Sequence, residues 1–332
     1  TRKSLAKNTY YERVKALNEG KTYIESLMNE ESLKDFLKNG NFTATYDFEK
    51  DIPKIDVAII CVPTPLDKYH QPDLSYLVST IEPLAKFGKR GIAISLESTT
   101  YPGTTEEVML PPLQKAGFTA GEDMFLIYSP EREDPGNGKF NTFTIPKLVS
   151  GITANCLEVA KAVYSLAIET VVPCATVKVA EMAKLLENIH RCINISMINE
   201  MKIIADKMGM NIWDVIDAAA TKPFGFTPYY PGPGIGGHCI PVDPFYLTWK
   251  AKEFGIHANF IELAGEMNFK VQDYVVEKVI SALNNHGKSL KDSKILVLGI
   301  AYKKNISDCR ESPSLTIMEK LKTYGAEITW HD

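Results

Sequence analysis

The chain has 332 residues, 45% of them hydrophobic, and a formal net charge of −4. This length exceeds what one hydrophobic core usually serves, so we expect two or three domains. Charges of both signs are spread along the sequence, which gives no reason to expect nucleic acid or an anionic membrane as a partner. No apolar run reaches the roughly 18 residues that cross a bilayer, and the start of the sequence lacks the apolar segment of a signal peptide. We expect a soluble, cytoplasmic protein.

Six cysteines occur, at positions 61, 156, 174, 192, 239 and 309. Only His238–Cys239 brings a histidine next to a cysteine. Adjacent side chains on an extended backbone point apart, so this pair would chelate a metal poorly, and we expect no metal site. The even count allows three disulfides, but thiols fit a long, cysteine-poor chain better.

The first half of the sequence alternates short apolar runs with helical patterns. Strands are predicted at 55–62, 91–96, 125–129 and 168–172, and helices at 73–86, 104–116 and 154–167, after a helix-like segment at 12–20. Strands that alternate with helices indicate a parallel sheet covered on both faces.

The pattern changes after Pro173. Between 177 and 208 apolar residues recur at helical spacing. A helix of that length is about 45 Å long, so we expect it to link domains and to carry a subunit interface. A short helix at 211–220, a Gly- and Pro-rich loop at 222–244 and helical patterns at 246–282 follow.

A second α/β segment closes the sequence, with a strand at 293–302, a helix at 314–324 and a strand at 326–330. One βαβ unit cannot bury its own faces, so we expect only the beginning of this domain in the sequence given. The first 50 residues also lack the Gly-x-Gly-x-x-Gly that opens a dinucleotide-binding domain. We therefore expect the first βα unit of that domain to be missing from the sequence given as well.

These elements predict an α/β fold with two Rossmann-like domains, joined by a long central helix and a helical middle domain. The expected boundaries are 1–175 for the first Rossmann-like domain, 176–285 for the central dimerisation domain, and 286–332 for the start of the second Rossmann-like domain.

The most specific feature is the run Pro231-Gly-Pro-Gly-Ile-Gly-Gly-His-Cys239. Its glycines leave backbone N–H groups open to close approach by a ligand. Cys239 follows at once, and Asp243 lies four residues further on. A thiol among amide donors and cationic neighbours can have a depressed pKa and act as a nucleophile. The alternative is a turn with a buried structural cysteine.

On the long predicted helix, Glu181, Lys184 and Asn188 are spaced at i, i+3 and i+7. Lys184 and Asn188 share a face, and a cation beside an amide can stabilise a developing oxyanion. The alternative is a Glu–Lys pair at the surface with an ordinary polar asparagine.

Polar runs follow three successive predicted strands: Cys61-Val-Pro-Thr-Pro65, Glu97-Ser-Thr-Thr100 and Ser129-Pro-Glu-Arg132. Open α/β sheets bind ligands at the carboxyl ends of parallel strands. The hydroxyls of Thr64, Ser98 and Thr99 can therefore meet a cofactor or hold a water, although Thr, Ser and Pro are also common turn residues.

A last polar run, Tyr302–Pro313, connects the predicted strand and helix of the second α/β segment. Lys303, Lys304 and Arg310 make it cationic, as a diphosphate would require. A solvated basic loop is the alternative.

Taken together and in this order, the runs resemble the nucleotide-sugar 6-dehydrogenases of the UDP-glucose dehydrogenase superfamily, from about Glu12 to Asp332. The motifs that carry the resemblance are Cys-Val-Pro-Thr-Pro, Ser-Thr-Thr-Tyr-Pro-Gly-Thr, Ser-Pro-Glu-Arg, Lys184-x-x-x-Asn188, Gly-Gly-His-Cys-x-x-x-Asp, and Lys303 with Arg310-Glu-Ser-Pro. The segment 224–250 looks most like the members that act on UDP-N-acetylhexosamines. The N-acetylglucosamine type is favoured, with its C2 epimer as a close competitor and UDP-glucose as a further alternative.

The resemblance implies NAD-dependent, four-electron oxidation of the C6 hydroxyl to a carboxylate. It implies that Cys239 forms a thiohemiacetal and then a thioester, that Lys184 and Asn188 stabilise the oxyanions, and that Asp243 assists proton transfer or positions water. It also implies that Glu131 and Thr99 hold and activate the hydrolytic water.

The implied NAD contacts are Val62, Thr64, Ser98, Thr99 and Arg310. The implied substrate contacts are Glu131, Arg132, Lys184, Asn188, Tyr230, Gly232, Gly234, Gly236 and Lys303. A homodimer or higher oligomer and a role in making uronic acids for surface polysaccharides are further implications.

Two other hypotheses remain open at this point. A two-electron hydroxyacid dehydrogenase also uses a Lys-x-x-x-Asn helix, but it has no need of a cysteine in a Gly-rich loop. An inactive homologue kept for oligomerisation or regulation would explain the absent glycine-rich phosphate loop.

Overall fold

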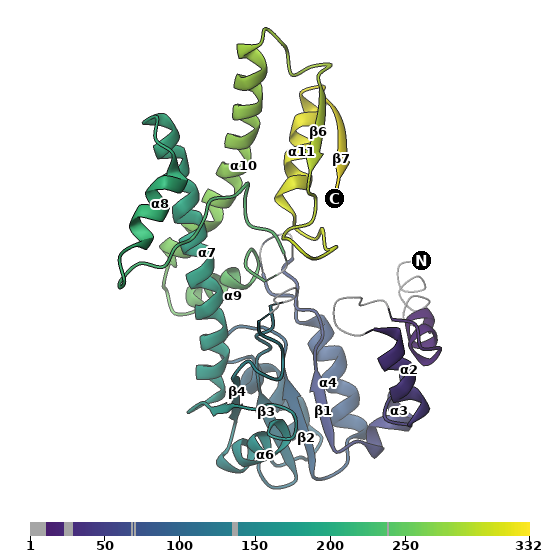
Figure 1. Ribbon diagram of the computed structural model, residues 1–332. Coiled ribbons are helices and arrows are strands. Elements are labelled where there is room, and N and C mark those ends of the chain that lie inside the picture. Colours follow the sequence, from purple (N-terminus) through teal and green to yellow (C-terminus); the bar gives the residue numbers. More distant parts are fainter. Residues whose placement is uncertain (1–10, 23–28, 68, 70, 135–138, 238) are drawn as a thin grey trace. The chain divides into compact units, whose positions relative to one another are not determined.

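The computed structural model describes residues 11–22, 29–67, 69, 71–134, 139–237 and 239–332 (Figure 1). The chain divides into two compact units. The first unit holds Thr1–Pro63, Leu74–Ser98 and Gly103–Ala180, and the second holds Thr64–Asp73, Thr99–Pro102 and Glu181–Asp332. His238 of the predicted nucleophile loop lies outside the described residues.

The first unit is built on a five-stranded sheet whose strands lie side by side in chain order. They are β1 (Val57–Ile60), β2 (Ile92–Leu96), β3 (Met124–Tyr128), β4 (Lys147–Gly151) and β5 (Val171–Pro173). The pairs β1–β2 and β2–β3 are parallel, as predicted, and the pair β4–β5 is parallel too.

Strand β4 is a correction to the sequence prediction, which contained no strand there and expected a parallel sheet throughout. It pairs with β3 in antiparallel orientation. A parallel pairing needs a crossover that returns the chain to the same end of the sheet, usually a helix. The described part of the connection from β3 to β4 contains no helix, so the chain runs back along β3.

Helices cover both faces of this sheet (Figure 1). On one face, α4 (Ser75–Phe87), the π-helical turn Thr105–Met109 and α5 (Leu110–Lys115) form a core with Ile92, Ile94 and Leu96. On the other face, α6 (Ala154–Tyr164) packs with Ala93, Ile127 and Val149. Neighbouring residues of β2 therefore face opposite cores, as the two-residue period of a strand requires.

Among the described residues, three short helical segments precede β1. Residues 11–18 are helical, close to the predicted segment at 12–20. Helix α2 (Glu30–Lys38) and helix α3 (Phe48–Asp51), which a 3-10 turn at Ile52–Lys54 continues, were not predicted. The side chain of Asn29 caps α2 by accepting a hydrogen bond from the backbone N–H of Ser32.

Helix α7 (Val177–Lys207) is the predicted long helix, and it begins in the first unit and continues into the second. It is followed by α8 (Ile212–Ala220), α9 (Asp243–Lys252) and α10 (Asn259–Asn285). The helical pattern predicted at 246–282 is thus two helices. In the described residues, no helix combines the length and apolarity that crossing a membrane requires.

The end of the second unit is a two-stranded parallel sheet of β6 (Lys294–Leu298) and β7 (Glu327–His331), connected by α11 (Pro313–Thr323). Its small core joins α10 and α11 through Val276, Ile317 and Leu321. This is the predicted βαβ segment.

Candidate functional site

Helix α7 carries the predicted Lys184 and Asn188 in the second unit. Glu181 is fully buried, and only 9% of Lys184 is exposed, so the hypothesis of a Glu–Lys pair at the surface is wrong. The Nδ2 group of Asn188 donates a hydrogen bond of 2.5 Å to Oδ2 of Asp243. The structure therefore brings the predicted helix pair to the predicted aspartate.

Asp243 is the first residue of α9, and its backbone N–H donates to the carbonyl oxygen of Cys239 at 2.7 Å. Its side chain is buried. Burial raises the pKa of this carboxyl to about 7, although the charge of Lys184 and the hydrogen bond from Asn188 act to lower it. A carboxyl group with this pKa can both accept and release a proton near neutral pH.

Cys239 lies at the end of the Gly- and Pro-rich loop. Burial, and next the negative charge of Asp243, raise the pKa of its thiol above the usual value. Lys184, Arg310 and Arg191 act in the opposite direction. The expected cations are therefore near the thiol, but the prediction of a depressed thiol pKa is wrong, because burial and a carboxylate outweigh them. All six cysteines are free thiols.

Two helix asparagines hold the backbone of the loop, and sequence reasoning missed both. Asn199 of α7 accepts a hydrogen bond from the N–H of Gly232 at 2.9 Å. Asn268 of α10 accepts from the N–H of Ile235 and donates to its carbonyl oxygen at 3.4 Å. Nothing in the local sequence distinguishes these asparagines from ordinary polar residues of a helix.

The Gly- and Pro-rich loop packs against the cationic run at 302–313. The N–H of Gly237 donates to the carbonyl oxygen of Arg310 at 3.2 Å. A Cβ on Gly236 would lie 2.6 Å from Cβ of Tyr302 and 2.9 Å from the carbonyl oxygen of Glu311. Glycine is required at this position because a second backbone segment occupies the space of a side chain. The tertiary fold thus unites two runs that the sequence singled out separately.

Arg310 forms an ion pair that the sequence analysis did not foresee. Its Nε donates to both carboxylate oxygens of Asp308, at 3.0 and 2.9 Å. This hydrogen-bonded carboxylate raises the pKa of the guanidinium. Lys303 lies in the same run, and Tyr230, half-exposed, directs its hydroxyl toward Asp217 at 3.4 Å.

Thr64 and Thr99 belong to the second unit and contact each other. The hydroxyl of Thr64 donates to the carbonyl oxygen of Thr99 at 2.8 Å. The carbonyl oxygen of Thr64 accepts a hydrogen bond from the hydroxyl of Tyr246, a fully buried residue of α9. The two segments that follow β1 and β2 are therefore connected to each other and to the helix that Asp243 begins.

Val62 and Ser98 lie in the first unit, where the register aligns the carboxyl ends of β1, β2 and β3. The hydroxyl of Ser98 donates to the carbonyl oxygen of Val62 at 2.7 Å. Uncharged hydroxyls and carbonyl groups at the ends of neighbouring parallel strands are suited to the ribose and amide groups of a dinucleotide. These residues therefore fit an NAD site.

Glu131, also in the first unit, contacts a lysine that the sequence analysis did not identify. Its Oε2 lies 2.8 Å from the ammonium of Lys147, the first residue of β4. Its Oε1 accepts hydrogen bonds from the backbone N–H groups of Arg132 and Glu133 at 2.7 and 2.8 Å. The guanidinium of Arg132 itself donates to the carbonyl oxygen of Pro146. Lys147 was missed because β4 was missed.

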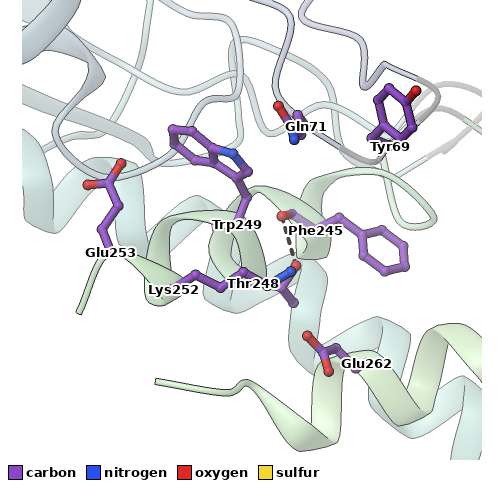
Figure 2. A pocket seen from close by; sticks show the side chains of 8 residues that line it. All are labelled: Tyr69, Gln71, Phe245, Thr248, Trp249, Lys252, Glu253 and Glu262. Carbon is purple, nitrogen blue, oxygen red and sulfur yellow. Dashed lines mark hydrogen bonds between the residues drawn. The ribbon is translucent and has the colours of Figure 1, made fainter. Parts of the chain in front are cut away.

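A pocket of about 610 Å³ lies elsewhere in the second unit (Figure 2). Figure 2 shows Phe245, Thr248 and Trp249 on α9, with Tyr69 and Gln71 from the segment that follows Thr64. None of the predicted site residues lines it. The described residues also contain no cluster of histidine, cysteine and carboxylate side chains that could hold a metal ion.

Comparison with known proteins relates this chain to one family along most of its length. Residues 8–168, 178–270 and 296–332 match the NAD-binding, central and UDP-binding domains of the UDP-glucose/GDP-mannose dehydrogenase family. Protein CapL of Staphylococcus aureus is 42% identical over 299 residues, which are 89% of this chain and 70% of that protein.

Several further relatives have names that state a substrate. The UDP-N-acetyl-D-glucosamine 6-dehydrogenase of Pseudomonas aeruginosa is 38% identical, over 85% of this chain and 67% of that protein. The structure of the UDP-D-ManNAc dehydrogenase from Pyrococcus horikoshii matches with a TM-score of 0.90 and 31% identity, over 96% of this chain and 75% of that one.

The chain therefore belongs to the UDP-glucose/GDP-mannose dehydrogenase family. Its family and the names of several relatives indicate an NAD-dependent UDP-sugar dehydrogenase, and NAD is the cofactor of its first domain. The predicted fold class, the predicted enzyme class and the predicted cofactor are confirmed.

Proposed function

We propose that the chain oxidises the C6 hydroxyl of a UDP-N-acetylhexosamine to the uronic acid, with UDP-N-acetylglucosamine favoured and Cys239 as the covalent nucleophile. The observation that carries the proposal is the group formed by Cys239, Asp243, Lys184 and Asn188, in which a thiol, a buried carboxyl, an ammonium and an amide are coupled.

NAD, when bound, accepts one hydride in each of the two oxidations. Asp243 accepts the hydroxyl proton as C6 becomes an aldehyde carbon, and its pKa of about 7 suits this role at neutral pH. The sulfur of Cys239 then bonds to that carbon. The thiol proton passes to solvent as sulfur adds, and the carbonyl oxygen becomes the oxyanion of a thiohemiacetal.

The cation and the amide of α7 stabilise that oxygen in our proposal. Lys184 supplies a positive charge and Asn188 an N–H donor, and both act most strongly on a negative oxygen in a buried site. Loss of the second hydride leaves a thioester on Cys239, which keeps the carbon at the acid oxidation level. Water then adds to the thioester and the C–S bond breaks. One proton of that water ends on the sulfur of Cys239, which is again a thiol, and the other is released to solvent as the carboxylate forms.

Glu131 and Thr99 are proposed to hold the hydrolytic water. The backbone carbonyl of Thr99 is already engaged by Thr64, which leaves its hydroxyl as the polar group for this role. Glu131 offers carboxylate oxygens whose orientation is fixed by two backbone N–H groups and by Lys147.

The substrate and cofactor contacts are proposed to be those that the resemblance implies. The loop from Tyr230 to Gly236 would lie on the sugar nucleotide, and Lys303 would bind its diphosphate. Arg132 completes the substrate contacts. Val62, Thr64, Ser98 and Arg310 would meet NAD.

The choice of sugar rests on the segment 224–250 and on relatives that act on N-acetylhexosamines. The P. aeruginosa relative named for N-acetylglucosamine is 38% identical, and the P. horikoshii structure named for N-acetylmannosamine is 31% identical. UDP-N-acetylmannosamine and UDP-glucose are therefore the competing substrates.

The test counts NADH per sugar consumed, with each of these three nucleotides. We expect two NADH and one uronic acid per UDP-N-acetylglucosamine, with a higher kcat/KM than for the other two. One NADH per sugar would exclude the four-electron mechanism. No NADH with any of the three would favour an inactive homologue kept for assembly.

Cys239→Ser gives the complementary measurement. A serine hydroxyl is not ionised near neutral pH, and it forms an ester less readily than a thiol forms a thioester. Uronic acid should therefore form at least 100-fold more slowly. This factor is on the order of the rate lost when a positioned catalytic group is removed. Cys309→Ser, at a partly exposed cysteine of the 302–313 run, is the matched control and should retain two NADH per sugar.

We also propose a homodimer formed through α7. Met182, Leu186, Met197, Met201, Ile204 and Met208 are all more than 40% exposed and recur at helical spacing. Such a row is typical of a helix with a partner. Light scattering should give twice the chain mass, and Met201→Glu should give the monomer mass. We further propose a cytoplasmic location and a role in surface-polysaccharide synthesis. We also propose that the chain has three domains, with boundaries at 175 and 285.

A further inference from the structure

A buried ammonium in the first unit is shared by two carboxyl groups. Lys147 is only 5% exposed, and its Nζ lies 2.8 Å from Oε2 of Glu131 and 3.1 Å from Oε2 of Glu97. Placing a charged group in the interior costs several kcal/mol unless it is paired. A lysine at this position therefore depends on both carboxyl groups.

A hydroxyl chain fixes the second carboxyl group from the other side. The hydroxyl of Tyr164 on α6 donates to Oε1 of Glu97 at 2.7 Å and is 2.8 Å from the hydroxyl of Ser95. The ammonium of Lys147 also lies 5.4 Å from the ring centre of Tyr164. These contacts hold Glu97 in place. The ammonium of Lys147, paired with Glu97, therefore stays next to Glu131.

Burial acts to raise the pKa of Glu131. Two effects outweigh burial and lower this pKa: the hydrogen bond and charge of Lys147, and the backbone N–H groups of Arg132 and Glu133. Without the ammonium, two carboxyl groups would remain close together with no cation between them. One member of such a pair takes up a proton.

We propose that Lys147 is a positioning residue for the hydrolytic half of the reaction: it holds Glu131 in its ionised form and aims its carboxylate. The inference rests on the proposed function, because it assumes that Glu131 holds the water that hydrolyses the Cys239 thioester. Lys147 itself touches neither substrate nor cofactor in this scheme.

Each element around Glu131 contributes a charged or titratable group. These groups are Cys61 after β1, Glu97 after β2, Arg132 and Glu133 next to Glu131, Lys147 on β4 and Tyr164 on α6. Burial raises the pKa of Cys61 to about 11 and raises the pKa of Tyr164, so neither becomes charged below pH 9. In this part of the fold, the acid limb of hydrolysis therefore reports on the carboxyl group of Glu131, whose pKa Lys147 acts to lower.

The experiment follows the Cys239 thioester by intact-protein mass after rapid mixing with UDP-N-acetylglucosamine and NAD, from pH 4 to 9. Lys147→Met should accumulate the adduct, and the midpoint of the acid limb of its decay should rise by about one to three pH units. Lys147→Arg keeps the positive charge and should remain close to the wild-type midpoint.

Glu97→Gln should move the midpoint of the acid limb in the opposite direction. This measurement does not depend on whether Lys147→Met folds. With one competing carboxyl group removed, Lys147 serves Glu131 alone, so the acid limb should move to lower pH. Lys161→Met is the matched control, since this lysine pairs with Glu158 at the surface of α6, and its profile should equal the wild type.

A folded Lys147→Met with the wild-type acid limb, or an upward shift in Glu97→Gln, would overturn the inference. Titration of ¹³C-labelled glutamate in the free protein gives a readout without turnover. The Glu131 signal, assigned by its loss in Glu131→Gln, should titrate at higher pH in Lys147→Met than in the wild type. If neither the wild type nor Lys147→Met forms an adduct on Cys239, the proposed function fails instead, and this titration still decides whether Lys147 sets the charge of Glu131.

Discussion

The amide of Asn188 donates a hydrogen bond to the carboxyl group of Asp243 across 55 residues of sequence. It joins the middle of α7 to the first residue of α9, and it brings together two of the motifs that the sequence presents separately. The bond favours the ionised carboxylate, yet burial still raises the pKa of Asp243 to about 7. The consequences of that raised pKa can be measured.

The first prediction concerns stability against pH. Asp243 has an unfolded pKa of 3.8 and a folded pKa of about 7, so between these values the folded state binds more protons than the unfolded state. The free energy of unfolding should therefore fall as pH rises through this window. The contribution is on the order of 4 kcal/mol at 1.36 kcal/mol per pKa unit.

Urea unfolding at pH 4.5 and pH 8 measures this effect. The difference between wild type and Asp243→Asn isolates it from all other groups, because asparagine does not titrate. The asparagine variant should gain stability relative to the wild type at pH 8. If the difference in free energy of unfolding between the two proteins is the same at pH 4.5 and pH 8, the raised pKa of Asp243 is contradicted.

The second prediction concerns the reactivity of Cys239. Burial, followed by the charge of Asp243, raises the pKa of its thiol above 9.0. Alkylation by iodoacetamide, monitored by peptide mass, should therefore be half-maximal above pH 9. Asp243→Asn removes the negative charge and should shift that midpoint downward. If the substitution leaves the midpoint unchanged, the two groups are not electrostatically coupled.

The third prediction compares two glycines of one loop. Gly236→Ala would place Cβ 2.9 Å from the carbonyl oxygen of Glu311, so one backbone segment must shift. The loss of a positioned loop should lower kcat/KM by on the order of 100-fold, since a misplacement of about 1 Å has that effect. Gly232→Ala is the comparison within the same loop and should give the smaller loss, because nothing in the protein lies within 4 Å of its new Cβ. Equal losses in both variants would show that backbone flexibility, and not the close approach, explains the glycines.

The fourth prediction concerns Asn268. Its side chain pairs with both backbone groups of Ile235, and the residue is buried. Asn268→Ala leaves these groups without a partner, which should cost about 1–3 kcal/mol of unfolding free energy. The variant should also raise KM, as the loop is proposed to bind substrate. Asn285→Ala, at the exposed end of the same helix, should change neither quantity.

Local patterns predicted much of this molecule. The spacing of apolar residues between 177 and 208 predicted α7 to within one residue of its end, because one face of a long helix repeats its burial every turn. The glycines from Gly232 to Gly237 were interpreted as leaving backbone N–H groups open to a ligand, and this stays a prediction, whereas Gly236 is a glycine because it meets a second backbone segment of the protein. The six runs in order were enough to identify the family.

Other features depend on contacts between distant parts of the chain. The described part of the connection from β3 to β4 contains no helix, so the alternation of strands and helices did not predict β4. Lys147, the first residue of β4, was missed for the same reason. Asn199 and Asn268 hold the loop, but in sequence they are polar residues within helices.

The sequence by itself determined the class of fold, the order of the elements and the residue types of the site, since these follow from local spacing and from motifs. Only the tertiary structure decided that the thiol of Cys239 has a raised pKa. It also paired Asp243 with Asn188 and placed Lys147 between two carboxyl groups. The physical reason is that burial and electrostatic interaction depend on which atoms are close in space, and neighbours in space are set by the whole fold.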